Sequence, residues 1–489
     1  MSSRFALPLI VAVLLLLAGQ GTGLPLVSGA QALHECGTPH RHHHDRDLQA
    51  RDEDDDDDDG AGRGLPRGCR GLKESDFFIG DPRPDAPELA YRGPYKVGVR
   101  TLEVVNPDQI DVLSFGPDNP LPLTDRRLTL EVWYPALLRR KQREITVYLD
   151  HLGTGPGVPD RPVTPFTFGG RAARDARPDP SGGPYPLVIF SHGYPGSRVL
   201  LSNLTENLAS KGYVVVSIDH TESTHADKVG FASTLMNRTL DIHFVLNEIA
   251  GMSHFGRPRF LSGLVDDDNT AIVGFSMGGY GALNAAGAGF TEGFVNSPFG
   301  VPGGFLSRLQ AGDPDYLELL DERIRAIVVF APFGGTFGIW DETTLQGLTV
   351  PSFFIVGDQD RTAPFAGVDF LVQNAVNSDR YYLKYQGAIH EVPVNPAPPI
   401  SESNYAEWLH YQEPAWDNRK LNNVNQHFIT AFLGRHLKGE ADRYEPYLNL
   451  LEPISNDSPR SDASDPRYWK GFTPFGAIAM ELRHLPAAR

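Results

Sequence analysis

Cysteine is scarce in this chain of 489 residues, since only Cys36 and Cys69 occur. A fold stapled by several disulfides is therefore excluded, and packing of apolar side chains has to hold the core. In an oxidising compartment the two cysteines could close one disulfide around an acidic loop, or they could remain unpaired. Both lie before the part of the chain where regular hydrophobic patterning begins.

The chain also lacks an excess of positive charge. Its formal net charge is -17, and the eight residues from Asp52 to Asp59 are all acidic. Nucleic-acid binding needs clustered Lys and Arg to neutralise phosphates, so the composition argues against a nucleic-acid partner. Without the acidic run the rest of the chain is only moderately acidic.

Long apolar runs are missing beyond the N-terminus. Residues 1–30 hold one Arg, a short apolar stretch and then small residues, with Ser28 and Ala30 at the positions that a signal peptidase prefers. This pattern is typical of a secretory signal peptide and is short for a membrane span. We expect a secreted protein with no integral membrane span after signal removal; an uncleaved anchor is the alternative.

Residues 31–75 have few apolar side chains and are expected to be disordered. The histidines here could bind a transition metal, but a solvated tail is the simpler interpretation because no fixed geometry is implied. No metal site is predicted from this segment, whose clustered histidines are His40, His42, His43 and His44.

Residues 76–489 have the composition and patterning of one large domain. Buried, strand-like runs alternate with helix-like segments, which predicts an α/β fold with a mostly parallel central sheet and helices on both faces. An alternating strand is expected at 127–135. Further strands are expected at 185–193, 213–220, 270–276, 325–333 and 351–360, and helices at 200–212, 234–251, 277–289 and 423–437.

Three insertions interrupt this alternation, at 151–184, 290–322 and 391–420. The first is rich in Gly and Pro and is expected to be a long loop. In parallel-sheet folds ligands bind beyond the carboxyl ends of the strands, where such loops gather. The insertions are therefore expected to lie over the functional site.

The stretch Gly274-Phe275-Ser276-Met277-Gly278 is a G-x-S-x-G motif. The five residues alone are a weak signal, but here a buried strand ends at Ser276 and a small-residue helix follows at once. This setting indicates a nucleophile elbow, in which a strained turn exposes the serine at the top of the sheet. The alternative is that the glycines serve only close packing of helix and sheet.

A serine nucleophile needs a base and an acid, which follow it in the order Ser, Asp or Glu, His. Asp360 follows a predicted strand and is the expected acid, with Asp358 as the alternative. His390 follows the next strand-like run and is the expected base. His410 and His427 also follow the serine, but they fall in a loop and in a predicted helix.

Two backbone N–H groups usually stabilise the oxyanion of acyl transfer. The expected donors are Met277, directly after the serine, and Tyr194, in the loop after an earlier strand. Arg238 and Asp241 are one helical turn apart, so a local ion pair or an anchor from helix to core is expected. Asp219 and His220 end a strand near the site and could shape it without belonging to the triad, which is Ser276, Asp360 and His390.

Three sequons fit the N-glycosylation pattern, beginning at Asn203, Asn237 and Asn456. The pattern is weak, and the first two fall in predicted helices. We expect a glycoprotein only to the extent that these positions are accessible.

With these motifs, residues 185–437 resemble the α/β-hydrolase superfamily. The stretches "GFSMGG", "FAPFGG", "DRTAP" and "GAIHEVP" are similar to the elbow, the next strand end, the acid loop and the histidine loop of bacterial cutinases and polyester hydrolases. That resemblance implies that Phe333 lines an acyl or aromatic subsite together with Tyr194.

A second likeness is to the platelet-activating-factor acetylhydrolase and dienelactone-hydrolase-like group, through "FSHGYPGSR" and "IDHTESTHAD". The acetylhydrolase pattern has its acid where this chain has Ala331, and dienelactone hydrolases use Cys where this chain has Ser276. Both departures favour the cutinase-like arrangement.

The expected function is a secreted serine hydrolase of carboxylic esters that forms an acyl-enzyme without a metal or organic cofactor. The expected substrate is a small-molecule, lipid or polyester ester, and a lipid or polyester would be contacted at an interface. The alternatives are a phospholipid acyl hydrolase, a peptidase or amidase, since the sequence does not separate ester from amide cleavage, and a non-catalytic binding protein that kept the scaffold.

Overall fold

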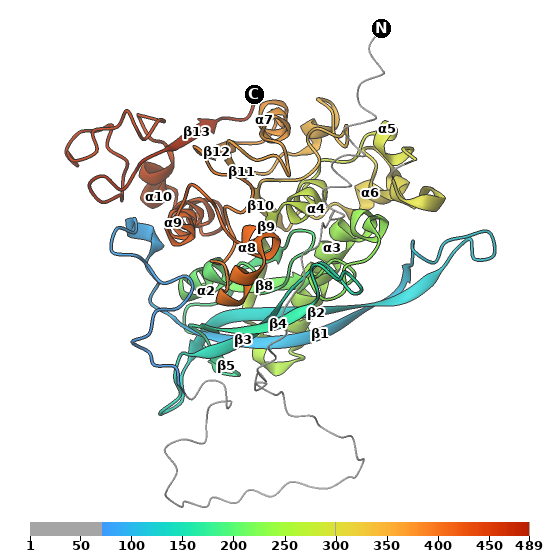
Figure 1. Ribbon diagram of the computed structural model, residues 1–489, viewed down its shortest axis with the longest axis horizontal. Helices are drawn as coiled ribbons and strands as arrows, with labels where there is room; N and C mark the ends of the chain where they lie inside the picture. Colours follow the sequence, from blue (N-terminus) through green and yellow to red (C-terminus); the bar gives the residue numbers. More distant parts are fainter. Residues whose placement is uncertain (1–70, 299, 489) are drawn as a thin grey trace, which may run out of the picture.

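The computed structural model describes residues 71–298 and 300–488 (Figure 1). The signal peptide, both cysteines, the histidine cluster and the acidic run therefore lie outside the described residues. The only part of the segment 31–75 that falls inside is 71–75, which forms turns.

One large sheet organises the described chain (Figure 1). Its central strands are parallel, as the runs of buried Val, Ile and Phe predict. In spatial order they are β12 (Arg380–Tyr385), β11 (Ser352–Gly357), β10 (Ile324–Phe330), β9 (Val265–Phe275), β7 (Tyr185–Ser191) and β8 (Val214–Asp219). The mostly parallel sheet expected from the sequence is confirmed.

Antiparallel strands extend the sheet at both ends. Next to β8 lies the long pair β2 (Leu123–Leu137) and β1 (Lys96–Ile110), and beyond β12 lies β13 (Met480–Leu485). The short β5 (Ala173–Arg174) and β6 (Arg177–Pro178) pair with β1 and β2. The β1–β2 hairpin projects past the rest of the sheet (Figure 1).

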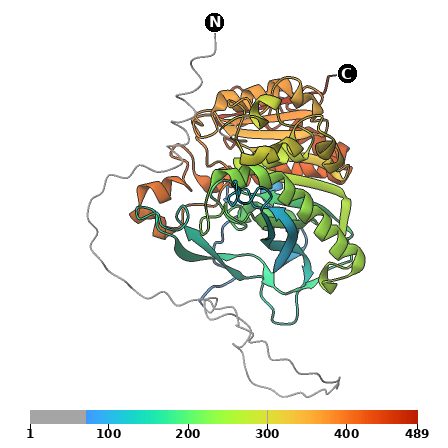
Figure 2. The same ribbon diagram turned by 90° about the vertical axis from the view of Figure 1, so that its right-hand side faces the viewer.

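Helices cover both faces of the sheet, as Figure 2 shows from the side. On one face α3 (Phe231–Phe255) and α4 (Met277–Ala285) pack on β7 and β9, and on the other α2 (Ser202–Ser210) and α9 (Asn418–Leu437) pack together against the strands. This is the layered arrangement of the α/β-hydrolase fold. The remaining α-helices are α5 (Glu292–Val295), α6 (Pro314–Leu319), α7 (Phe365–Asn374), α8 (Tyr405–Leu409) and α10 (Ala441–Leu448), and the 3-10 turns are η2 (Glu88–Ala90), η3 (Arg259–Leu261), η4 (Pro302–Leu309), η5 (Thr344–Gly347) and η6 (Pro399–Ser403).

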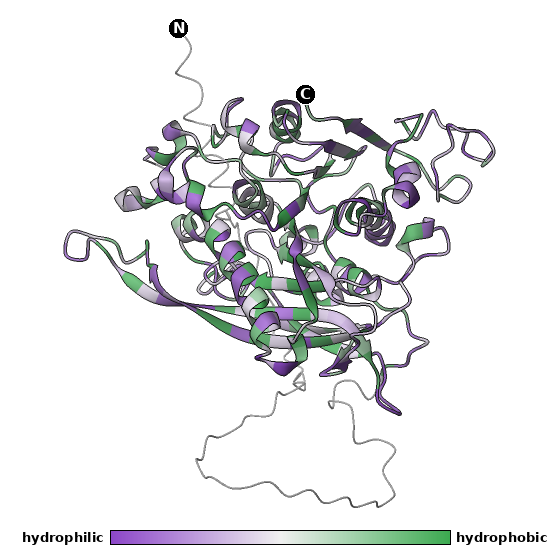
Figure 3. Cartoon of the chain, turned by 180° about the vertical axis from the view of Figure 1, so that it is seen from behind, coloured by the Kyte–Doolittle hydropathy of each residue, from purple (hydrophilic) through white to green (hydrophobic). Residues whose placement is uncertain are grey.

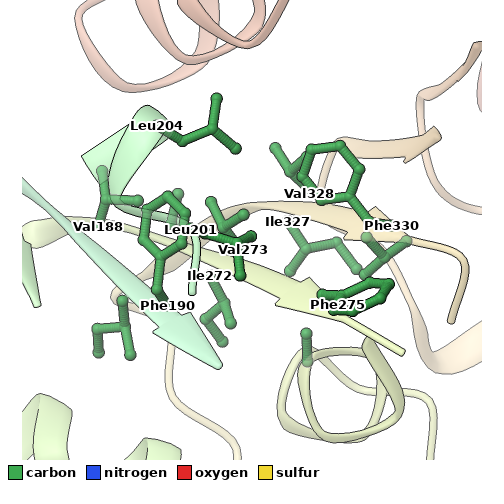
Figure 4. Close-up of a cluster of buried hydrophobic side chains, with 14 of the residues drawn as sticks. Val188, Phe190, Leu201, Leu204, Ile272, Val273, Phe275, Ile327, Val328 and Phe330 are labelled. Carbon is green, nitrogen blue, oxygen red and sulfur yellow. The ribbon is translucent and has the colours of Figure 1, made fainter. Parts of the chain in front are cut away.

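The core is built from the side chains of the central strands and of the helices on them (Figure 4). Val188, Ile272 and Val328 are fully buried in the strands, and Leu204 of α2 packs over them. Each such side chain contributes about 1.5–3 kcal/mol through burial. Hydropathic colouring shows apolar segments on the strands and polar ones mainly at the periphery (Figure 3). A rigid core thus carries the loops at the strand ends.

Residues 151–184 are not the single long loop that their Gly and Pro content predicts. They contain β4 (Thr164–Gly170), which pairs antiparallel with β3 (Thr146–Leu152) in a separate two-stranded sheet. Tyr148 and Phe168 pack together across this hairpin with ring centroids 5.4 Å apart. Alternating aromatic side chains outweigh the Pro and Gly around them, because they fit a pleated, half-buried surface.

Candidate active site

Ser276 lies at the turn between β9 and α4, where the sequence motif predicts it. Its φ of 53° and ψ of -112° are strained for a residue with a side chain. The turn is held by its backbone: Ser276 N–H donates to Phe330 O (2.9 Å), and Phe333 N–H donates to Ser276 O (3.0 Å). Neighbouring β10 therefore fixes the strain that presents the serine.

The elbow glycines are required by contact rather than by helix preference. A Cβ on Gly278 would lie 1.8 Å from Ser191 O, and one on Gly274 would lie 2.3 Å from Gly278 O. These oxygens belong to the backbone and cannot move aside as a flexible side chain would. At these two positions the glycines therefore serve both the close packing of helix on sheet and the sharp turn at Ser276. The glycines let α4 approach the end of β7 and thereby seat the serine next to the Gly193 loop.

Replacement of Gly278 by alanine is expected to destabilise the fold by about 3 kcal/mol or more, because overpacking at a rigid backbone costs at least this range. Denaturant unfolding of the variant measures the loss. The matched control is Gly293→Ala in α5, where an added Cβ meets open space. Equal midpoints for the two variants would contradict the tight contact at the elbow.

Asp360 and His390 are paired in the structure. His390 Nδ1 lies 2.7 Å from Asp360 Oδ2, and both side chains are buried. The other carboxylate oxygen, Oδ1, accepts from the backbone N–H groups of Thr362 (2.8 Å) and Ala363 (3.0 Å). The loop after β11 thus holds the carboxylate rigidly against the imidazole, as an orienting acid requires.

Asp358, the alternative acid, has a different position. Its Oδ1 accepts from Gly387 N–H (2.8 Å), so it ties the loop after β11 to the turn after β12. It makes no hydrogen bond to His390 within the described residues. The geometry therefore favours Asp360 as the acid.

His390 packs against the elbow. Its ring lies 5.0 Å from that of Phe275, the residue before Ser276. Within the described residues Ser276 Oγ makes no hydrogen bond to His390, and such catalytic hydrogen bonds are often long before substrate binds. The structure thus brings the base beside the serine and pairs it with the acid. His410 and His427 lie elsewhere: His410 is beside Glu391, and His427 Nδ1 accepts from Leu89 N–H.

Charge around His390 sets its protonation. Burial lowers the pKa of His390, but the charge and hydrogen bond of Asp360 outweigh burial and raise it to about 9. Glu391 and Glu413 also face this imidazole. Burial raises the pKa of Glu391 to about 8 and that of Glu413 to about 7. An imidazolium formed in the reaction would therefore be strongly stabilised here.

The pH dependence of turnover should follow from this shift. A general base works only when neutral, so kcat/KM should rise with pH through an apparent pKa above 6.5 and toward about 9. For stability the sign is opposite: the ion pair stabilises the fold below about 6.5 and is lost as the pH rises through about 9. A profile of kcat/KM from about pH 5 to about pH 10 tests this. A fall in kcat/KM as the pH rises from about 6.5 to about 9 would contradict this role of His390.

The loop after β7 lies against Ser276. A Cβ on Gly193 would be 3.6 Å from the Cβ of Ser276. The backbone N–H groups of Tyr194 and Met277 donate no hydrogen bond within the described residues, although buried N–H groups are nearly always paired. Two unpaired donors beside the serine are what an oxyanion hole offers, and the second stands at the N-terminus of α4.

Aromatic rings line one side of this loop. Phe231 lies 5.0 Å from Tyr194 and 5.8 Å from Phe333, and Phe333 stacks on Phe337 at 5.0 Å. The Tyr194 hydroxyl donates to Val229 O. The sequence singled out Tyr194 and Phe333, but Phe231 and Phe337 carried no motif. They complete an apolar wall next to the backbone of Ser276.

Arg238 and Asp241 do not form the local ion pair that their spacing predicts. Asp241 pairs with Arg126 on β2 (2.7 Å) and with His220 Nδ1 (2.8 Å). Arg238 turns instead to the loop after β7 and donates to the carbonyls of His192 and Gly193. The side chain of Asp219 pairs with Arg198. The alternative expectation, an anchor from helix to core, matches Arg238.

A second Ser-His-Asp arrangement lies below that loop, and sequence reasoning missed it. Ser191 Oγ is 2.8 Å from His220 Nε2, whose Nδ1 faces Asp241. Ser191 is 1% exposed, and its Oγ also accepts from Arg238 (3.3 Å). Burial lowers the pKa of His220 to about 3. A fully buried serine without a strained turn is a structural hydrogen-bonding group rather than a nucleophile.

Two of the insertions meet beside His390. Arg161 pairs with Glu407 of α8 at 2.6 Å, and Glu413 accepts from the backbone N–H groups of Ile389 and Glu391 (both 2.7 Å). The segment 391–420 is thus bound to the histidine loop and to the segment 151–184. Ser276 itself is 8% exposed.

The sequons differ in accessibility. Asn203 is fully buried and its amide nitrogen donates to Pro393 O, and Asn237 is buried with its amide on Ser233 Oγ. Neither can carry a bulky glycan in this fold, because α2 and α3 pack these faces inward. Asn456 is exposed and remains the candidate acceptor.

The described residues form neither a membrane-spanning helix nor a metal-binding cluster. No helix there is long and apolar enough to cross a bilayer. No group of three or more His, Cys, Asp or Glu side chains in residues 71–298 and 300–488 has the geometry to hold a metal ion.

Comparison with known proteins agrees with the fold and the motifs. Residues 171–239 match the family model described as platelet-activating factor acetylhydrolase, isoform II. Cutinase 1 of Thermobifida cellulosilytica is 27% identical over 228 residues, which are 46% of this chain and 67% of that protein. The chain has the α/β-hydrolase fold and is similar in sequence to these esterases.

The chain is also similar to two further proteins. Cutinase est1 of Thermobifida alba is 24% identical over 212 residues, and the match spans 43% of this chain and 54% of that protein. The chain thus spans about half the length of this cutinase. A solved ferulic acid esterase from Streptomyces cinnamoneus superposes with a TM-score of 0.48 and 21% identity, covering 73% of this chain and 94% of the other.

Proposed function

We propose that the protein is a serine hydrolase of carboxylic esters that works through an acyl-enzyme. The observation that carries the proposal is the strained Ser276 at the β9–α4 turn, next to a buried, paired His390 and Asp360. Strain at a turn persists only where the surrounding structure enforces it, and such strain is common at active sites. The similarity to cutinases supports the same reaction class.

The proposed first step is attack of Ser276 Oγ on the ester carbonyl carbon. The serine proton passes to His390 Nε2, and the carbonyl oxygen becomes an oxyanion held by the N–H groups of Tyr194 and Met277. When the tetrahedral intermediate collapses, the C–O bond to the alcohol breaks and His390 returns the proton to the leaving oxygen. The acyl group then remains on Ser276.

In the second step water attacks the acyl-enzyme. His390 takes a proton from the water, and a second tetrahedral intermediate collapses to carboxylic acid and free Ser276, which regains its proton. Asp360 stays ionised throughout, keeps Nδ1 protonated and stabilises the imidazolium. The residues need no metal or organic cofactor for these steps.

Among substrates we favour a carboxylic ester with an apolar or aromatic acyl group. The wall of Tyr194, Phe231 and Phe333 beside the serine offers rings on which such a group can pack. A phospholipid acyl hydrolase is the second candidate, because of the match at residues 171–239. Against it, the position of the acetylhydrolase acid is occupied by Ala331, and Asp360 stands in the later loop. A secreted location is part of the same proposal, on the pattern of residues 1–30.

The test is turnover of a series of p-nitrophenyl esters, from acetyl to long acyl and benzoyl, by the full chain. We expect hydrolysis with a preference that depends on acyl size. If no ester is hydrolysed and a fluorophosphonate probe leaves Ser276 unlabelled, the protein is a binding module on a hydrolase scaffold.

A further inference from the structure

A buried guanidinium stands directly behind the loop that carries Tyr194. Arg238 on α3 is 1% exposed, and no carboxylate of the described residues lies within ion-pair distance of it. Asp241, the nearest candidate by sequence, is occupied by Arg126 and His220. Burial of a charge without a partner is costly, so the position of Arg238 calls for a function beyond packing.

The acceptors of Arg238 are concentrated on the loop after β7. Nη1 donates to His192 O, and Nη2 donates to Gly193 O at 2.8 Å. Ser191 Oγ and Ser223 Oγ accept from the same two nitrogens. A fork of fixed geometry thus clamps two consecutive peptide carbonyls, which lysine could not do.

His192 assists at the same carbonyl. Its Nδ1 lies 2.7 Å from Gly193 O, and its Nε2 accepts from His220 N–H at 3.2 Å. Because a carbonyl only accepts, these two contacts assign the proton to Nδ1. Burial keeps the pKa of His192 well below its usual value, so the ring is neutral. Gly193 O therefore receives one charged and one neutral hydrogen bond.

Peptide geometry links these bonds to the reaction. The C=O and N–H of a trans peptide point in opposite directions, so drawing Gly193 O toward Arg238 turns the N–H of Tyr194 to the opposite side. The Gly193 backbone abuts Ser276, and the N–H of Tyr194, which points away from Arg238, has no partner within the described residues. A peptide whose carbonyl faces a cation is also polarised, which strengthens its N–H as a donor.

We propose that Arg238 is a positioning residue of the oxyanion hole: it fixes and polarises the Gly193–Tyr194 peptide so that the Tyr194 N–H meets the oxyanion. This inference rests on the proposed serine-hydrolase function. Because substrate carbonyl and oxyanion differ in charge, the clamp should act on the transition state more than on substrate binding. The buried Ser191–His220–Asp241 array supports this arrangement, because Ser191 Oγ accepts a hydrogen bond from Arg238.

The test compares Arg238→Gln with Arg380→Gln in the full chain. Arg380 is also buried and also donates to backbone carbonyls, those of Val372, Ser378 and Pro486. It is the first residue of β12 and pairs with Leu485 of β13, whereas Ser276 follows the last residue of β9. Both variants lose comparable hydrogen bonds, and the melting temperature of each reports that structural cost. Only the Arg238 variant should lose catalysis.

The expected result is a fall in kcat of roughly 10- to 100-fold for Arg238→Gln, since removing a whole oxyanion donor costs about 10²–10³. KM should change little. Phenylboronic acid forms a tetrahedral boronate with Ser276 Oγ, and the hydroxyl proton of the serine moves to His390. The affinity for this compound should weaken by a similar factor. Arg238→Lys retains the charge without the fork and should fall between wild type and Arg238→Gln.

The outcomes separate the two proposals. If wild type shows no Ser276-dependent turnover, the proposed function fails and this inference falls with it. If wild type is active and Arg238→Gln keeps kcat and boronate affinity while losing stability as Arg380→Gln does, only the inference is overturned. If Arg238→Gln does not fold, Arg238→Lys and the milder Ser223→Ala replace it. The same two quantities, kcat and the affinity for phenylboronic acid, are then compared with those of wild type.

Discussion

Replacement of Ser276 by alanine is expected to reduce ester turnover by roughly 10⁴-fold or more, because removing a triad nucleophile leaves only the binding and oxyanion contributions. The substitution removes one oxygen from a site that is already nearly closed, so the fold should be unaffected. Initial rates on the most reactive p-nitrophenyl ester measure the loss, and the melting temperature verifies folding.

The second Ser-His-Asp arrangement supplies the sharpest comparison for this variant. Ser191 makes a hydrogen bond of 2.8 Å to its histidine, which Ser276 does not, yet Ser191 is only 1% exposed. Ser191→Ala should lose far less activity than Ser276→Ala. If Ser276→Ala keeps full activity and Ser191→Ala loses it, Ser191 and not Ser276 is the nucleophile.

Replacement of Asp360 by asparagine is expected to lower kcat by about 10⁴, the loss seen when a triad acid is replaced by its amide and the imidazole adopts the wrong tautomer. The size of the loss follows from the position of the group: Asp360 Oδ2 is 2.7 Å from His390 Nδ1, and its charge raises the pKa of that imidazole. The same substitution should shift the rise in kcat/KM to lower pH.

Asp358→Asn is the matched control for Asp360→Asn. The two aspartates are two residues apart on one loop, and an amide at 358 can still accept from Gly387 N–H. We expect its kcat within about threefold of wild type, since surface hydrogen bonds of this kind contribute about 1 kcal/mol at most. If Asp358→Asn loses turnover and Asp360→Asn retains it, the assignment of Asp360 as the acid is wrong.

The sequence was sufficient for the central layers of the fold. Strands such as 185–191 and 352–357 are continuous runs of apolar residues because both of their faces are covered, and that pattern is visible without neighbours. The hairpin of β3 and β4 was not predictable in the same way. Its stability comes from packing of Tyr148, Phe168 and Trp133, which a local reading of Gly and Pro cannot detect.

The candidate site likewise has residues that the sequence predicts and residues that it does not. Ser276, Asp360 and His390 each stand at a strand end with a recognisable local pattern. The clamp of Arg238 joins a helix to a loop 45 residues earlier in the chain, and no motif marks it. The expected pairing of Arg238 with Asp241 was wrong because helical spacing shows which residues are neighbours along one element, but not which partner a second element offers. Arg126 on β2 supplied that partner.

The measurement that tests the central claim most directly is labelling of the full chain with a fluorophosphonate, followed by peptide mapping of the modified residue. The account predicts a single phosphonylated serine at position 276, with labelling abolished in Ser276→Ala and slowed in Asp360→Asn. Labelling at Ser191, or no labelling of the folded protein, would contradict it.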